Sequence, residues 1–83
     1  MEKVTVQILI PVLDEMYEVS IPSTLAIRMV TQLLLELVSE LSAGKYRPSG
    51  TEILCREGTE HVLHESLSFY DYSIKNGEKL VLL

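Results

Sequence analysis

The sequence predicts a small α+β domain in which one long helix covers one face of a mixed sheet. Two stretches of alternating apolar and polar residues come first, an amphipathic helical stretch follows, and short strand-like segments complete the chain. The resulting order, ββαβββ, is typical of a two-layer architecture, because the apolar faces of helix and sheet must cover each other. With 83 residues, the chain has the length of one domain (residues 1–83) built around one modest core.

The first two strands are predicted from a period of two in hydrophobicity. In residues 3–10, one face of the strand is apolar and consists of Val4, Val6, Ile8 and Ile10. Pro11 cannot donate a ladder hydrogen bond, so the first strand should end near it. Residues 16–21 alternate again after a short connection, which favours an antiparallel hairpin.

A helix is predicted from Leu25 to about Ser42. Ser23 or Thr24 is the expected N-cap, and Gly44 is the expected left-handed terminator. On a helical wheel the apolar arc comprises Ala26, Ile27, Met29, Val30, Leu33, Leu34, Leu37, Val38 and Leu41. Leu35 falls among the polar residues, so the pattern places it on the solvent side.

The remaining strands are shorter. Residues 45–50 contain Pro48 and Gly50 and are expected to form a loop, and residues 51–56 a third strand. The sequence leaves open which of its alternate residues face the helix, either Ile53 and Cys55 or Leu54. Residues 57–60 are expected to form a turn and 61–63 a short fourth strand.

The last strand, at residues 79–83, follows a tight turn at Asn76-Gly77. The first and last strands are the most apolar, so we expect them side by side, parallel and central. The expected core is Val4, Val6, Ile8, Val30, Leu34, Leu37, Leu80 and Leu82.

Composition excludes several classes of function. Seven Lys and Arg against twelve Asp and Glu give a net charge of −5, which argues against a nucleic-acid binder. No apolar run reaches the roughly 18 residues of a membrane span, so no membrane insertion is expected. The beginning Met1-Glu2-Lys3 leads into strand-like alternation without a signal-peptide core, which favours the cytoplasm.

Catalytic and metal-binding residues are also not expected. His61, His64 and Cys55 are the obvious candidates, but zinc requires a closed set of three or four ligands, and no third group is evident to orient a Cys–His pair. We therefore predict surface histidines, a small buried cysteine, no cofactor and no enzymatic activity.

The C-terminal segment resembles ubiquitin-like proteins, in which a Leu, an Asp-Tyr pair and an Ile precede the final strand. Here these residues are Leu67, Asp71-Tyr72 and Ile74. Within that superfamily the chain is similar to the small bacterial YukD/EsaB group, whose Ile-x-Asn-Gly-Asp/Glu-x-Leu turn matches Ile74 to Leu80. The resemblance implies a ubiquitin-like β-grasp fold and a hydroxyl on Tyr72 that pins a nearby loop.

The resemblance also implies a function. Members of the YukD/EsaB group are non-conjugated accessory components of the bacterial type VII secretion system, so the expected partners are protein components of the secretion apparatus. The chain is expected to be a monomer or a weak homodimer. The alternatives are a stand-alone adaptor of an unrelated assembly and a degenerate sulfur or acyl carrier. The run Leu80-Val81-Leu82-Leu83 lacks the glycines that a carrier needs, which argues against conjugation.

A surplus of apolar residues at outward positions predicts a protein-binding surface. The main binding patch of ubiquitin combines a loop leucine with outward residues of the third and fifth strands. The matching positions here are Leu13, Leu54 (or Cys55), Val81 and Leu83. A cluster of such residues marks a contact site, whereas scattered surface leucines, the alternative, carry no such meaning.

Overall fold

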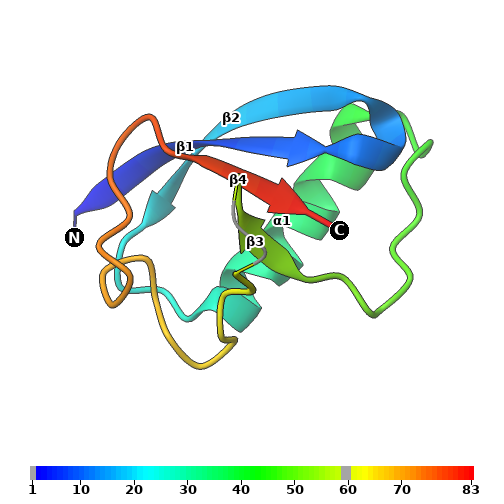
Figure 1. Cartoon of the computed structure of the whole chain (residues 1–83). Coiled ribbons are helices and arrows are strands. Elements are labelled where there is room, and N and C mark those ends of the chain that lie inside the picture. The colour runs from blue at the N-terminus through cyan, green and yellow to red at the C-terminus, as the bar shows by residue number, and fades with distance from the viewer. Residues whose placement is uncertain (1, 59–60) are drawn as a thin grey trace.

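The computed structural model describes residues 2–58 and 61–83, which contain one α-helix, one short 3-10 helix (Pro11–Leu13) and four strands (Figure 1). The strands are β1 (Lys3–Ile10), β2 (Glu15–Pro22), β3 (Leu54–Arg56) and β4 (Lys79–Leu82), and the helix is α1 (Ile27–Leu41). They form one sheet in the order β2-β1-β4-β3, with α1 across one face. β1 pairs antiparallel with β2 and parallel with β4, as predicted.

The third and fourth predicted strands differ from the observed ones. β3 begins at Leu54, and two backbone hydrogen bonds between Ile53 and Leu83 continue its pairing with β4 by one residue. The predicted strand residues before Ile53 are not part of β3, and there the side chain of Glu52 accepts hydrogen bonds from the backbone amides of Ser49 and Gly50. Residues 61–63 contribute one isolated bridge, between Val62 and Cys55, rather than a strand. Of the turn predicted at 57–60, Thr59 and Glu60 lie outside the described residues.

The core lies between α1 and the sheet. The buried face of β1 is Val4, Val6, Ile8 and Ile10, and from α1 come Ile27, Val30, Leu34 and Val38. Leu80 and Leu82 complete the predicted set, but Leu37 is only half-buried and is not a core member. Leu35, predicted to face solvent, packs against the core instead. The apolar arc is broader than the sheet can cover, and the covered part is centred closer to Leu34 than to Leu33.

The start of α1 corrects the capping prediction. Ala26 is the N-cap residue and makes no side-chain cap, so neither Ser23 nor Thr24 has that role. The first helical amides donate instead to carbonyls of a distant loop, Ile27 to Leu67 (2.7 Å) and Arg28 to Glu65 (2.9 Å). Since these bonds satisfy orphan N–H groups of the first turn, a capping side chain is not needed.

The end of α1 is a Schellman motif. The amide of Gly44 donates to the carbonyl of Ser39, and that of Ala43 donates to Glu40. Gly44 has a positive φ of 81°, as predicted, but the left-handed conformation begins one residue earlier, at Ala43 with a φ of 56°. At the Asn76-Gly77 turn, Gly77 also takes a positive φ of 86°. Within the described part of the chain, no helix is both long enough and apolar enough to cross a membrane.

Candidate functional site

The sheet face that α1 leaves uncovered carries a continuous apolar row. Leu9 of β1 pairs with Met16 of β2 on one side and with Val81 of β4 on the other. Val81 pairs in turn with Cys55 of β3, which bridges to Val62. Because directly paired residues project to the same face, these five side chains cross the whole sheet on its outer side.

A second pair extends this row toward one end of the sheet. Ile53 and Leu83 exchange two backbone hydrogen bonds of 2.9 Å, and both alternate with buried neighbours. We refer to the full set as the outer-face patch: Leu9, Met16, Ile53, Cys55, Val62, Val81 and Leu83.

The outer-face patch is exposed to solvent and contains a hollow. Leu83 is 57% exposed, Val62 47% and Ile53 41%, which is high for large apolar side chains on one face. Cys55 is only 6% exposed, yet it lines a cavity of about 260 Å³ together with Ile53, Val62, Val81 and Leu83. The thiol therefore forms the floor of a hollow large enough for one apolar side chain.

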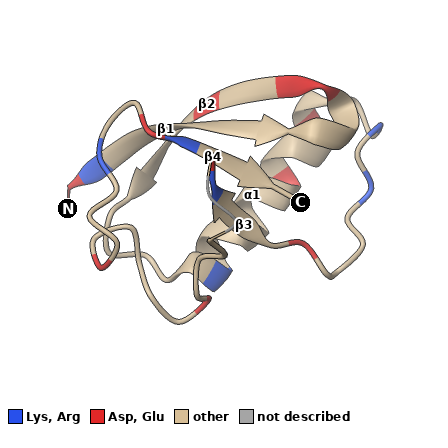
Figure 2. Ribbon diagram, viewed as in Figure 1, with Lys and Arg blue, Asp and Glu red and all other residues tan. Residues whose placement is uncertain are grey.

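A polar row borders the outer-face patch. Gln7 of β1, two residues before Leu9 and on the same face of the sheet, lies between Glu18 of β2 and Lys79 of β4. Figure 2 shows the charge at the start of β4 and none along the rest of that strand. An apolar centre with a polar border is the arrangement found in protein interfaces.

The four residues predicted for the site are only partly brought together. Val81 and Leu83 lie in the outer-face patch. Leu54 is 1% exposed and pairs with Leu82 in the core, so its predicted exposure was wrong, and the outward position belongs to the alternative, Cys55. Leu13 is half-buried against the core and lines a separate cavity of about 570 Å³ that Ile53 and Leu83 also border.

Sequence reasoning missed the other members of the outer-face patch as site residues. The alternation of β1 already placed Leu9 away from the core, and the same reasoning applied to the hairpin register would have added Met16. Val62 gave no such signal, because its position depends on an isolated bridge.

The loop beside Leu13 is held by Glu52. Its carboxylate accepts hydrogen bonds from the amides of Ser49 (2.6 Å) and Gly50 (2.9 Å) and from the Tyr46 hydroxyl (3.1 Å). Desolvation opposes ionisation of Glu52, but these hydrogen bonds prevail and lower its pKa. Burial and the same contact raise the pKa of Tyr46 to about 12. The loop is thus tied around an ionised carboxylate.

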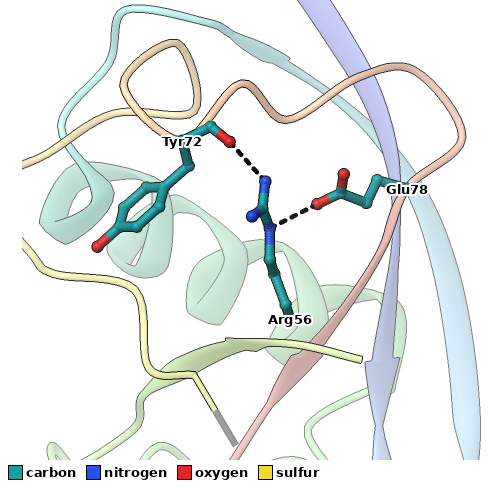
Figure 3. Close-up of polar contacts among 3 residues, drawn as sticks. All are labelled: Arg56, Tyr72 and Glu78. Carbon is teal, nitrogen blue, oxygen red and sulfur yellow. Dashed lines mark hydrogen bonds and ion pairs between the residues drawn. The ribbon is translucent and has the colours of Figure 1, made fainter. Parts of the chain in front are cut away.

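A polar cluster fixes the end of β3 to the C-terminal segment (Figure 3). Arg56 Nε forms an ion pair with Glu78 at 2.9 Å, and Arg56 Nη2 donates to the Tyr72 carbonyl at 2.6 Å. The Tyr72 hydroxyl accepts the backbone N–H of His64 at 2.7 Å. The predicted role of this hydroxyl, pinning a nearby loop, is confirmed.

The histidines take part in local contacts. The ring of His61 packs edge-on against Tyr72, with centroids 5.8 Å apart, and Nδ1 of His64 lies 2.7 Å from the Ser66 hydroxyl oxygen. Among the described residues, no group of three or more His, Cys, Asp and Glu side chains could hold a metal ion. Neither histidine is an outer-face patch residue, and both have structural partners.

Comparison with known proteins places the fold. No family model matches the chain, and no curated protein matches its sequence. Among solved structures, it is similar to the ubiquitin-like domain of the Mycobacterium tuberculosis type VII secretion system protein ECCD1, with 20% identity, a TM-score of 0.79, and coverage of 100% of this chain and 99% of that one.

Two further structures show how widely the fold is used. A chain of the MycP5-free ESX-5 inner membrane complex matches with 17% identity and a TM-score of 0.81, over 100% of this chain but only 21% of that one. A chain of the toluene 4-monooxygenase HD complex matches with 7% identity and a TM-score of 0.79, over 98% of this chain and 96% of that one. The chain thus has the ubiquitin-like fold, with structural neighbours in type VII secretion proteins.

Proposed function

We propose that the protein is a non-conjugated, non-enzymatic ubiquitin-like binding module of the YukD/EsaB kind, acting in the bacterial cytoplasm as an accessory component of a type VII secretion system. The structural neighbours among type VII secretion proteins support this proposal. The observation that carries the binding role is the apolar row from Met16 to Val62 across the outer sheet face.

The outer-face patch suits a protein partner that presents one apolar anchor. The cavity above Cys55 is about 260 Å³ and would accept one aliphatic or aromatic side chain, because most of its lining is apolar: Ile53, Val62, Val81 and Leu83, with Arg56 and Gly58 completing it. The polar row of Glu18, Gln7 and Lys79 would then border the contact on one side and tune association rate and specificity. The partner is a protein component of the secretion apparatus.

The test is substitution of Val81 by Asp. The side chain of Val81 is half-buried on the outer face, so the carboxylate would remain solvated in the free protein but would be desolvated in a complex. We expect Val81→Asp to weaken binding to purified secretion-apparatus components by about tenfold or more, with little change in melting temperature.

Leu41→Asp is the matched control, because Leu41 is 55% exposed and lies on α1, away from the outer face. Leu35 is unsuitable for this purpose because it packs against the core. Unchanged binding by Val81→Asp, together with loss of binding by Leu41→Asp, would assign docking to the helix and refute the outer-face patch.

A second candidate function is an adaptor in an unrelated assembly. The likeness to a chain of the toluene 4-monooxygenase HD complex favours it, since that assembly is not a secretion system. Neighbouring genes separate the two: a secretion ATPase and small helical export substrates nearby favour the first proposal, and their absence favours the second.

A sulfur or acyl carrier is the weakest candidate. Residues 79–83 contain no glycine, and Leu83 is tied to Ile53 by two backbone hydrogen bonds, so these residues do not form the flexible tail that a carrier presents to an adenylating enzyme. We expect no adenylate or thioester when the protein is incubated with adenylating enzymes and ATP. A covalent adduct through the terminal carboxylate, detected by mass spectrometry, would establish the carrier.

A further inference from the structure

A second cavity adjoins the outer-face patch. The cavity of about 570 Å³ beside Leu13 shares Ile53 and Leu83 with the hollow above Cys55. Val12, which is 77% exposed, adds a further apolar side chain to its lining. We refer to this space as the loop cavity, because the loop between α1 and β3 supplies most of its lining. Since two side chains wall both spaces, a segment that fills the hollow can continue directly into the loop cavity.

The loop cavity carries two unpaired cations, Lys45 and Arg47. Within residues 2–58 and 61–83, neither side chain makes an ion pair or a hydrogen bond. Figure 2 shows two basic positions on the loop that leaves α1, and these are Lys45 and Arg47. No other two cations of the chain are so close in sequence, and its net charge is −5. The loop therefore concentrates positive charge on an otherwise acidic protein.

Glu52 does not neutralise these two cations by direct contact, although it is the acidic member of the described cavity lining. Its carboxylate accepts hydrogen bonds from the amides of Ser49 and Gly50 and from the Tyr46 hydroxyl instead. No ion pair joins it to either cation among the residues that the structure describes. The two cations are thus available to an anion that a partner supplies.

Tyr46 fixes the place of the two cations. It is 7% exposed, its amide donates to Ser42 Oγ at 3.0 Å, and its hydroxyl donates to Glu52 at 3.1 Å. Lys45 and Arg47 lie on either side of it in the chain, and both are exposed. Because the residue between them is held by both its backbone and its ring, their backbone is already ordered before binding, which reduces the entropy lost in a complex.

We propose that Lys45 and Arg47 form an anion-binding subsite beside the outer-face patch, and that the partner presents an acidic-apolar segment to the two. An apolar anchor of this segment fills the hollow above Cys55, and Asp or Glu residues further along it pair with the two cations. The anchor supplies most of the affinity, whereas charge complementarity selects the acidic segment. The inference rests on the proposed function, because it names the chemistry of the partner that binds the same surface.

The first experiment is an NMR titration of the whole protein with three capped peptides. They are acetyl-Phe-Gly-Ser-Gly-Asp-Asp-amide and the same peptide ending in Asn-Asn or in Lys-Lys. We expect the Asp-Asp peptide to bind about fivefold more tightly than the Asn-Asn peptide, and the Lys-Lys peptide to bind most weakly. The Asp-Asp peptide should shift the amides of Lys45 and Arg47 as well as those of Val62 and Val81, and the Asn-Asn peptide only the latter two.

Two double variants of equal net charge locate the effect. Lys45→Glu with Arg47→Glu should reverse the order, so that the Lys-Lys peptide binds most tightly. Lys3→Glu with Lys75→Glu is the matched control, because these lysines line a different cavity at the start of β1, and this variant should retain the preference for Asp-Asp. Val81→Ser removes an apolar wall of the hollow without adding charge, so it should weaken all three peptides alike.

The outcomes separate this inference from the proposed function. Equal affinity for the Asp-Asp and Asn-Asn peptides, with both weakened by Val81→Ser, would overturn the anion-binding subsite and leave the proposed function standing. Native affinity in Val81→Ser, with shifts confined to Lys45 and Arg47, would refute the outer-face patch and with it the continuous contact proposed here. Loss of the Asp-Asp preference in the Lys3 and Lys75 control would assign that preference to net charge and reject the subsite. Absence of any shift at millimolar peptide would reject both.

Discussion

Ala43 has a backbone conformation that usually belongs to glycine. Its φ of 56° places its Cβ close to the carbonyl oxygen, a strain that glycine avoids. We expect Ala43→Gly to raise the free energy of unfolding by about 0.5–1 kcal/mol, after the greater entropy of the unfolded glycine is subtracted. Urea denaturation measures this. Gly44→Ala is the converse: its Cβ would meet no atom within 4 Å, so any loss of stability reports the backbone strain at its φ of 81°.

Tyr72 offers a second test at a single atom. Removing the hydroxyl in Tyr72→Phe leaves the N–H of His64 without its acceptor at 2.7 Å. We expect a loss of about 0.5–1.5 kcal/mol and faster hydrogen exchange at the His64 amide. Tyr70→Phe is the matched control, since Tyr70 is 71% exposed, and it should leave both quantities unchanged.

Glu52 makes the 46–52 loop sensitive to acid. Its pKa is lower in the folded protein than the ordinary 4.5, so its contribution is present above that value and is lost as the pH falls through the lowered pKa. Because Glu52 is only half-buried and its contacts lie within one loop, we expect loosening of the loop rather than unfolding. Amide shifts of Ser49 and Gly50 should titrate in this acidic range in the native protein and not in Glu52→Gln. Identical titrations in the two proteins would show that another group holds the loop.

At the scale of elements, the position of α1 on the sheet decides how much stability is lost when a helix leucine is replaced by alanine. Leu34 is 1% exposed, whereas Leu37, one turn further along, is only half-buried. We expect Leu34→Ala to cost about 2–5 kcal/mol and Leu37→Ala clearly less. Thermal or urea unfolding of the pair measures the difference, and equal costs would mean that the helix presents a different face to the sheet.

The helix and strands also show how much of the fold could be predicted from the sequence. β1, β2, β4 and the helix were predictable because alternation and helical periodicity are local properties of the chain. The facing of Leu37 and Leu35 was not, because the apolar arc is wider than the covered face and tertiary packing chooses its centre. The N-cap prediction was wrong because the first turn of the helix also depends on tertiary structure: its amides donate to the carbonyls of Leu67 and Glu65, which lie in a distant loop.

The candidate site was predictable in part. The outward facing of Val81 and Leu83 depended on the expectation that Leu80 and Leu82 face the helix, and both of these leucines are buried. The sequence could not show which β3 side chains face the helix. Ile53, Leu54 and Cys55 are all apolar, so no alternation of apolar and polar residues distinguishes the two faces. The pairing of β3 with β4 settles the question, joining Leu54 to Leu82 and Cys55 to Val81.

At the scale of the whole molecule, the outer-face patch spans all four strands on the face away from α1. Because the patch is apolar and the charged residues lie only at its border, partner binding there should weaken only modestly with salt, since screening acts on exposed charges. Measuring the dissociation constant at low and at high salt checks this expectation.

The parallel pairing of β1 with β4 has a consequence for when the protein can fold during its synthesis on the ribosome. Ile8 lies beside Leu80, so the two central strands of the sheet come from opposite ends of the described chain. A ribosome releases β1 early but must translate through residue 82 before its neighbour exists. Until then the buried face of β1 lacks the strand that completes its core. The nascent chain should therefore remain protease-sensitive until β4 has left the exit tunnel, then fold as a unit within the time a small domain requires.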